Sequence, residues 1–182
     1  MSRAFTLIEV LVTTALSAIL LFVVIQLHIV YGRTIVFKQT SIGVALGGSN
    51  IIDAVRMAGS QARSVVATHS FSGVGYTSST TTVIFELPAI DASGGIIPNA
   101  YDYIGIYASS SNAYRSIDAA PGSARISGQK RLTNVLSSLS FTYDSPLFPS
   151  VTNITINATT SATIRGDMTQ THLRSRMYLR NI

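Results

Sequence analysis

The 182-residue chain contains no cysteine, and only 12% of its residues are charged. Without cysteine the chain has no disulfide framework, no thiolate zinc site and no thiol nucleophile. Charged residues are about half as frequent as in an ordinary soluble domain, whereas 47% of the residues are hydrophobic. This composition excludes intrinsic disorder, which requires low hydrophobicity and high charge. The length is sufficient for one domain with a substantial core.

Lysine is scarce too, because 11 of the 13 basic residues are arginine, against eight acidic residues. The resulting net charge of +5 predicts a weak attraction to anionic surfaces but specifies no partner. Serine and threonine together number 43. The polar surface is therefore expected to carry mainly hydroxyl groups rather than ions.

What the chain does have is one long apolar segment near its N-terminus. Val10 to Val30 gives 21 residues without a charge, a glycine or a proline. About 20 such residues cross the hydrocarbon core of a membrane as a helix. The apolar region of a cleaved secretory signal has only about 7–15 residues and ends in small residues. We therefore predict a membrane helix that stays in the protein. Arg3 lies before it and Arg33 and Lys38 follow it, so the positive-inside rule does not decide its orientation.

Glu9 is the one charged residue between Phe5 and Tyr31, and two interpretations of it compete. In the first, Thr6-Leu7-Ile8-Glu9 is a capping box at the start of the helix. In the second, Glu9 pairs with a cation once the helix leaves the lipid. An α-amine created by cleavage before Phe5, on the same or a neighbouring subunit, would supply that cation. Such a pair is worth about 4 kcal/mol at roughly 4 Å before desolvation is counted.

The segment from Arg3 to Val12, Arg-Ala-Phe-Thr-Leu-Ile-Glu-Val-Leu-Val, resembles the class III leader of type IV pilins and type II secretion pseudopilins. The resemblance implies that prepilin peptidase cuts between Ala4 and Phe5 and N-methylates Phe5. It also implies that Glu9 neutralises a Phe5 amine during filament assembly. The family usually has glycine before the cut, and this chain has Ala4, which occurs in some minor pilins.

Two further resemblances point to a subgroup. Major pilins commonly kink the helix with proline or glycine, whereas the first proline here is Pro88. The segments Ile52–Ser60 and Val151–Asn181 are loosely similar to the helix end and tail of minor pilins of the PilW type and of pseudopilin J. These similarities imply a minor pilin or pseudopilin, with other such subunits, prepilin peptidase and inner-membrane lipid as partners.

Beyond the membrane segment, apolar residues continue at helical spacing on one face to about Val65, namely Phe37, Val44, Ile51, Val55, Ala58, Ala62 and Val65. Glycines at 43, 47 and 48 suggest bending or fraying there. After Ala67 apolar residues alternate, which predicts strands and an α+β class with an antiparallel sheet. The expected division is a leader at 1–4, a membrane or filament-core helix at 5–31, its continuation at 32–66 and a β-rich periplasmic or extracellular domain at 67–182. The expected strands are 80–87, 103–107, 113–117, 139–143, 151–158, 162–165 and 171–179. The segments between them are expected to be turns, among them 91–99 and the surroundings of 127–130.

In the last predicted strand, Arg174, Arg176 and Arg180 share one face. This stripe could bind DNA phosphates, an acidic subunit or lipid headgroups. The alternative is a solvated face whose arginines discourage edge pairing, and the strand lacks a second aromatic residue for base stacking. Nucleic-acid binding therefore has no support beyond this stripe.

Catalysis is not expected. The S-x-x-K match from Ser127 to Lys130 lacks its partner motifs, and His28, His69 and His172 have no H-E-x-x-H spacing. We expect no catalytic residue, no cofactor and no metal. Two hypotheses remain, a filament subunit and a static single-pass anchor carrying a β-sheet domain that binds an acidic ligand, either DNA or a partner protein.

Overall fold

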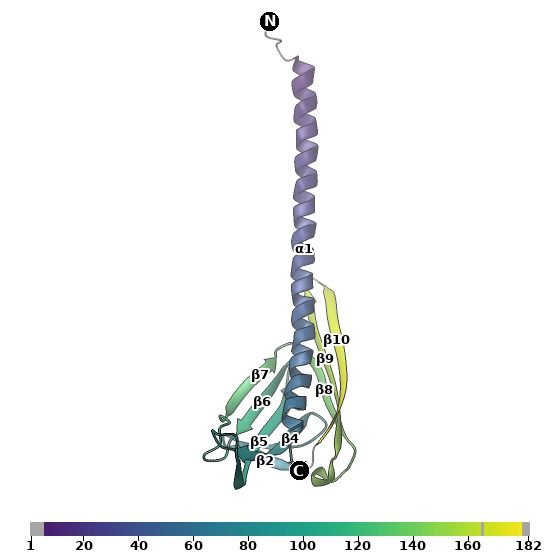
Figure 1. Cartoon of the computed structure of the whole chain (residues 1–182). Helices are drawn as coiled ribbons and strands as arrows, with labels where there is room; N and C mark the ends of the chain where they lie inside the picture. Colours follow the sequence, from purple (N-terminus) through teal and green to yellow (C-terminus); the bar gives the residue numbers. More distant parts are fainter. Residues whose placement is uncertain (1–5, 165, 180–182) are drawn as a thin grey trace. The chain divides into compact units, whose positions relative to one another are not determined.

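The computed structural model describes residues 6–164 and 166–179 (Figure 1). The chain divides into a first unit that ends at Thr40 and a second unit that begins at Ser41. An α-helix, α1, runs from Leu7 to Gly59 and contributes to both units. In the second unit the helix packs against antiparallel β-sheets. The predicted α+β class is therefore confirmed.

In the first unit, α1 is mainly apolar, and three of its threonine hydroxyls bond to its own backbone. Thr13 Oγ1 donates to the carbonyl of Glu9 at 2.7 Å, and Thr34 Oγ1 donates to that of Val30 at 3.0 Å. Such bonds to the preceding turn satisfy these hydroxyl donors in an apolar environment. The threonines are thus compatible with the membrane helix that the sequence predicts.

In the second unit, one face of α1 enters the core. Val44, Ile51, Val55 and Ala58, all predicted to share a face, are buried. Phe37, predicted on the same face, belongs to the first unit and is 39% exposed. The spacing of apolar residues therefore identified the buried face correctly from Val44 onward.

The glycines of α1 permit close packing rather than fraying, which corrects the sequence-based expectation. The helix is uninterrupted through Gly47 and Gly48, and both are buried. A Cβ added at Gly47 would lie 3.2 Å from Cβ of Thr133 and would overlap its hydroxyl. At Gly48 it would lie 2.9 Å from Cδ1 of Leu173. The cost of glycine in a helix is thus offset by close contact with both sheets.

The helix ends earlier than predicted. It stops at Gly59, where a Cβ would overlap the Met177 thioether, and not near Val65. Ser64 and Val65 instead form a short strand that pairs with Glu86 and Phe85. Val65 is fully buried, as its place in the apolar pattern suggested, but from a strand. The backbone hydrogen bonds of this strand pair thus take the place of those that the same residues would form in a longer helix.

The remaining elements are one 3₁₀ turn and strands of three antiparallel sheets. The first sheet has the order β1-β4-β5-β6-β7, the second β10-β9-β8 and the third β2-β3. Their bounds are β1 (Ser64–Val65), β2 (Thr68–Phe71), β3 (Val74–Thr77), β4 (Thr82–Ile90), β5 (Ile96–Ser109), β6 (Asn112–Asp118), β7 (Gly128–Thr133), β8 (Leu136–Tyr143), η1 (Phe148–Ser150), β9 (Asn153–Ile164) and β10 (Asp167–Tyr178).

The core of the second unit lies between the α1 face and the first two sheets. Among the largest fully buried side chains are Phe85 of β4, Ile106 of β5, Phe141 of β8, and Ile154 and Ile156 of β9. All belong to one cluster with the helix residues. Alternation of buried and exposed residues in β9 and β10 matches their pairing in one sheet with a single buried face.

Most predicted strands are present, with shifted ends. The expected separate strand at 162–165 is wrong, because β9 continues to Ile164 before the chain reverses into β10. Residues 128–130, taken as a turn, begin β7, and 96–99, taken as a loop, begin β5. Strands β1, β2 and β3 were not predicted, since two to four residues are too few to establish a period of two.

Candidate functional site

The exposed apolar surface of α1 is the largest chemical feature of the first unit. Every described residue from Thr6 to Gln39 is exposed, including Leu7, Phe22 and Tyr31. Soluble monomers do not leave an apolar surface of this extent in water. Within the described residues, α1 is the one helix long and apolar enough to cross a membrane. This surface requires lipid or other helices around it.

Glu9 forms the predicted capping box. Its Oε2 accepts hydrogen bonds from the Thr6 backbone N–H at 2.8 Å and from Thr6 Oγ1 at 3.0 Å. The Glu9 N–H in turn donates to Thr6 Oγ1 at 3.3 Å. Both bonds to the carboxylate fall on one oxygen, and Oε1 accepts none from the described residues. Ala4 and Phe5, the predicted processing residues, lie outside the described residues, as does the 1–4 leader.

The arginine stripe of β10 has the predicted alternation. Ser175 and Met177 are buried, whereas Arg174 and Arg176 are exposed on the opposite face. Arg176 has internal contacts, because its Nε donates to Asn153 Oδ1 at 3.2 Å and its guanidinium lies over Tyr178. Arg180 lies outside the described residues. Arg174 and Arg176 thus share one surface, and a hydrogen bond within the sheet already occupies one donor of the Arg176 guanidinium.

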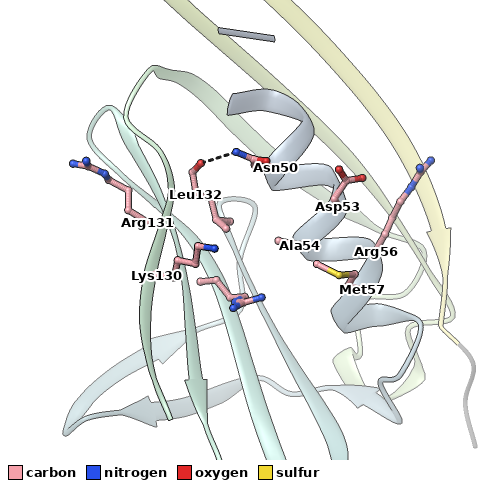
Figure 2. Close-up of a pocket in the computed structure, with 9 residues that line it drawn as sticks. Asn50, Asp53, Ala54, Arg56, Met57, Lys130, Arg131 and Leu132 are labelled. Atoms are coloured by element: carbon pink, nitrogen blue, oxygen red, sulfur yellow. Dashed lines mark hydrogen bonds between the residues drawn. The ribbon is translucent and has the colours of Figure 1, made fainter. Parts of the chain in front are cut away.

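A second basic site, absent from the sequence-based expectations, lies between α1 and the first sheet (Figure 2). This groove has a volume of about 580 Å³. Lys130 extends from β7 toward α1, whereas Arg131 points away from the helix (Figure 2). Asn50 Nδ2 donates to the Leu132 carbonyl at 3.4 Å across it. The groove is lined by Asn50, Asp53, Ala54, Arg56 and Met57 of α1, Arg115 of β6, and Lys130, Arg131 and Leu132 of β7.

Arg115 and Lys130 are direct partners in the β6–β7 ladder. Directly opposed residues of an antiparallel pair share one sheet face, and both line the groove against α1. Arg115 Nε is buried and has no hydrogen-bond partner among the described residues. Sequence reasoning missed this pair, because the residues are 15 positions apart and the β7 strand itself was taken as a turn. Their opposition follows only from the strand register.

None of the protein-family models, curated proteins or solved structures compared with this chain matches it. The arrangement of its elements is nevertheless distinctive. A long apolar N-terminal helix precedes antiparallel sheets, and the C-terminal part of that helix packs on them. The architecture is pilin-like.

The remaining candidate residues of this pilin-like chain have structural partners. Ser127 Oγ accepts a hydrogen bond from the Ala119 N–H at 2.9 Å. His69 stacks on Tyr103 with ring centroids 3.8 Å apart, and its Nε2 lies 2.8 Å from Asp118 Oδ2. His69 thereby ties β2 to the first sheet. Within the described ranges, no group of three or more metal-ligating side chains comes together.

The β3 strand is tied to the same sheet through tyrosines. Tyr76 donates a hydrogen bond to the Tyr107 hydroxyl at 3.0 Å, and this bond, with burial, raises the pKa of Tyr76 to about 12. The ring of Phe71 lies over Gly105, where an added Cβ would be 2.7 Å from the ring. These aromatic contacts hold the β2–β3 hairpin in place.

Proposed function

We propose that this chain is a minor pilin or pseudopilin, a structural subunit of a type IV pilus or a type II secretion-like filament and not an enzyme. The observation that carries the proposal is an apolar helix exposed along its first unit with a carboxylate in its first turn. A helix of this kind is held by lipid before assembly and by neighbouring helices afterwards. The same surface thus serves two environments in turn.

The position of Glu9 supports the processing part of the proposal. Cleavage between Ala4 and Phe5 would make Glu9 the fifth residue of the mature chain and create an amine one turn away. The capping box occupies one oxygen of the Glu9 carboxylate. The other oxygen remains for a cation, so the local cap and an amine partner are compatible. In an apolar bundle such a pair compensates a charge that would otherwise be costly.

In this proposal the chain is a single-pass protein of the inner membrane. The β-rich domain lies on the periplasmic or extracellular side and contacts other pilin or pseudopilin subunits. Prepilin peptidase is the processing partner. The chain needs no cofactor for this role, because assembly requires packing and charge pairing only.

The test is to purify the protein from membranes of cells with and without prepilin peptidase and to identify its N-terminus by mass spectrometry. We expect loss of Met1–Ala4 and an N-methylated Phe5 only in cells that have the peptidase. A Phe5→Asp variant, which places aspartate directly after the cleavage site, serves as the matched control. It should stay unprocessed in cells with and without the peptidase. An intact Met1 in both wild-type samples would contradict the proposal and favour the static anchor.

A further inference from the structure

The Arg115–Lys130 pair places two positive charges directly opposite each other on the α1-facing side of the first sheet. Like charges directly opposed in a sheet are destabilising. Burial of Arg115 Nε without a hydrogen-bond partner in the described part of the chain adds to this destabilisation. Nothing in the folding of the β6–β7 ladder requires two cations there. A negative group between the two side chains would remove this destabilisation.

No acid of the described residues neutralises the pair. The ion pairs found there join Arg63 to Glu86, His69 to Asp118 and Arg125 to Asp102. Asp53 lines the groove but forms no ion pair with either cation, and it accepts a hydrogen bond from Ser49 Oγ at 3.3 Å. The groove thus keeps an uncompensated positive charge.

The groove also has apolar walls, formed by Ala54, Met57 and Leu132. A smaller cavity of about 190 Å³ shares Ala54, Met57 and Arg115 with it, so the two adjoin. The smaller cavity adds Ile104 and Ile117 as apolar walls. Together they follow α1 and the turn after it from Asn50 to Gln61, a distance of roughly 16 Å at helical rise. An extended peptide of about five residues has this length.

We propose that this groove binds an extended acidic segment of a partner protein. A carboxylate of that segment lies between Arg115 and Lys130, and an apolar side chain enters the smaller cavity between Ile104 and Ile117. Met57, which is 56% exposed, supplies an adaptable apolar contact. The proposal does not depend on the filament role, since it stands on the charges and walls of the second unit.

The lining residues favour a peptide over a nucleic acid. None of the residues that line the two cavities is aromatic, so the groove offers a nucleic-acid base no aromatic ring to stack on. The apolar walls suit aliphatic side chains. Arg125, which lines the smaller cavity, is already neutralised by Asp102. Arg56 is held by a hydrogen bond from its Nε to Ser175 Oγ at 3.0 Å, and Arg131 points away from α1 (Figure 2). The pair Arg115–Lys130 is therefore where a single carboxylate would find two opposed cations.

The proposal is tested with the full chain in phosphatidylcholine nanodiscs and a fluorescent seven-residue peptide of alternating glutamate and valine. Fluorescence anisotropy measures its binding, with a glutamine-for-glutamate peptide as the matched probe. We expect the acidic peptide to bind and the glutamine peptide not to bind. The double variant R115Q/K130Q should weaken binding by about tenfold or more, because both charge-assisted bonds are lost. Arg174→Gln removes one positive charge from the exposed face of β10 and should leave binding unchanged.

A variant that is expected to bind the peptide more tightly distinguishes a change in the binding site from a loss of the fold. Asp53→Asn removes the acid that lines the groove and should tighten peptide binding severalfold, since it removes a charge that repels the acidic peptide. Four results would overturn the proposal: no binding, equal binding of the glutamine peptide, equal weakening by Arg174→Gln, or preferential binding of a thymidine oligonucleotide. The last would assign the groove to nucleic acid instead.

Discussion

The guanidinium of Arg125 and the carboxylate of Asp102 form a buried ion pair, with Nη1 and Oδ2 2.5 Å apart. Asp102 lies in β5 and is fully buried. It also accepts hydrogen bonds from the Ala120 N–H at 2.7 Å and from Ser123 Oγ at 2.8 Å. The carboxylate therefore organises the connection between β6 and β7, which precedes the strand that carries Lys130.

Asp102→Asn is expected to destabilise the second unit by about 3–5 kcal/mol, because it leaves the Arg125 charge buried without its partner. The measurement is chemical unfolding of the full chain in detergent, followed by tyrosine fluorescence, since the chain has no tryptophan. Asp53→Asn is the control, and this exposed position should change stability by less than about 0.5 kcal/mol. Equal losses in the two variants would show that the buried pair has no special role.

The glycines of α1 give a paired prediction. Gly43 has nothing within 4 Å of an added Cβ, whereas Gly47 faces Thr133 and Val135. Gly43→Ala should stabilise the chain by up to about 1 kcal/mol through helix propensity. Gly47→Ala should destabilise it by about 1–3 kcal/mol through overpacking. Thermal unfolding of both variants measures the difference, and a stabilising Gly47→Ala would refute the close packing described above.

Glu9→Ala is expected to leave membrane insertion intact and to abolish incorporation into filaments. The reason is that insertion depends on the apolar length, whereas assembly depends on the carboxylate. Thr6→Val removes the capping hydroxyl but keeps the Glu9 charge, so its filament content should stay near the wild-type level. Immunoblots of membrane and sheared filament fractions measure both. Loss of filaments in Thr6→Val as well would show that Glu9 acts only as a helix cap.

Asp144 gives a prediction on acid stability. Burial would raise its pKa, but hydrogen bonds from Thr152 and Asn153 outweigh this and hold the pKa below its ordinary value of 3.8. A lowered pKa stabilises the fold above the unfolded-state value, and that stability is lost as pH falls through the folded-state value. Asp144→Asn should therefore be less stable than the wild type at pH 7. The difference should shrink below pH 3.8.

The measurement is the unfolding free energy of both proteins from pH 7 to pH 2, and the quantity of interest is their difference. Between pH 7 and pH 5 the difference should be constant, because Asp144 stays ionised in both states. A difference that grows as pH falls would have the wrong sign and would contradict the hydrogen-bond assignment.

The sequence by itself determined the apolar helix, the buried face from Val44 onward and the alternation of β10. Each depends on local periodicity, which a single segment records in its own residues. The capping box at Glu9 was likewise visible, because its partners are three residues apart. Features that depend on the residues of a single helix or strand could thus be predicted from the sequence alone.

Tertiary structure decided where contacts between distant segments fall. Gly47 and Gly48 weaken a helix taken alone, and only the approach of Thr133 and Leu173 explains them. The helix ends at Gly59 because the following residues pair with β4. Arg115 and Lys130 meet through the register of two strands, and no local pattern encodes that register. The basic groove therefore could not be predicted, since both of its walls come from elements far apart in sequence.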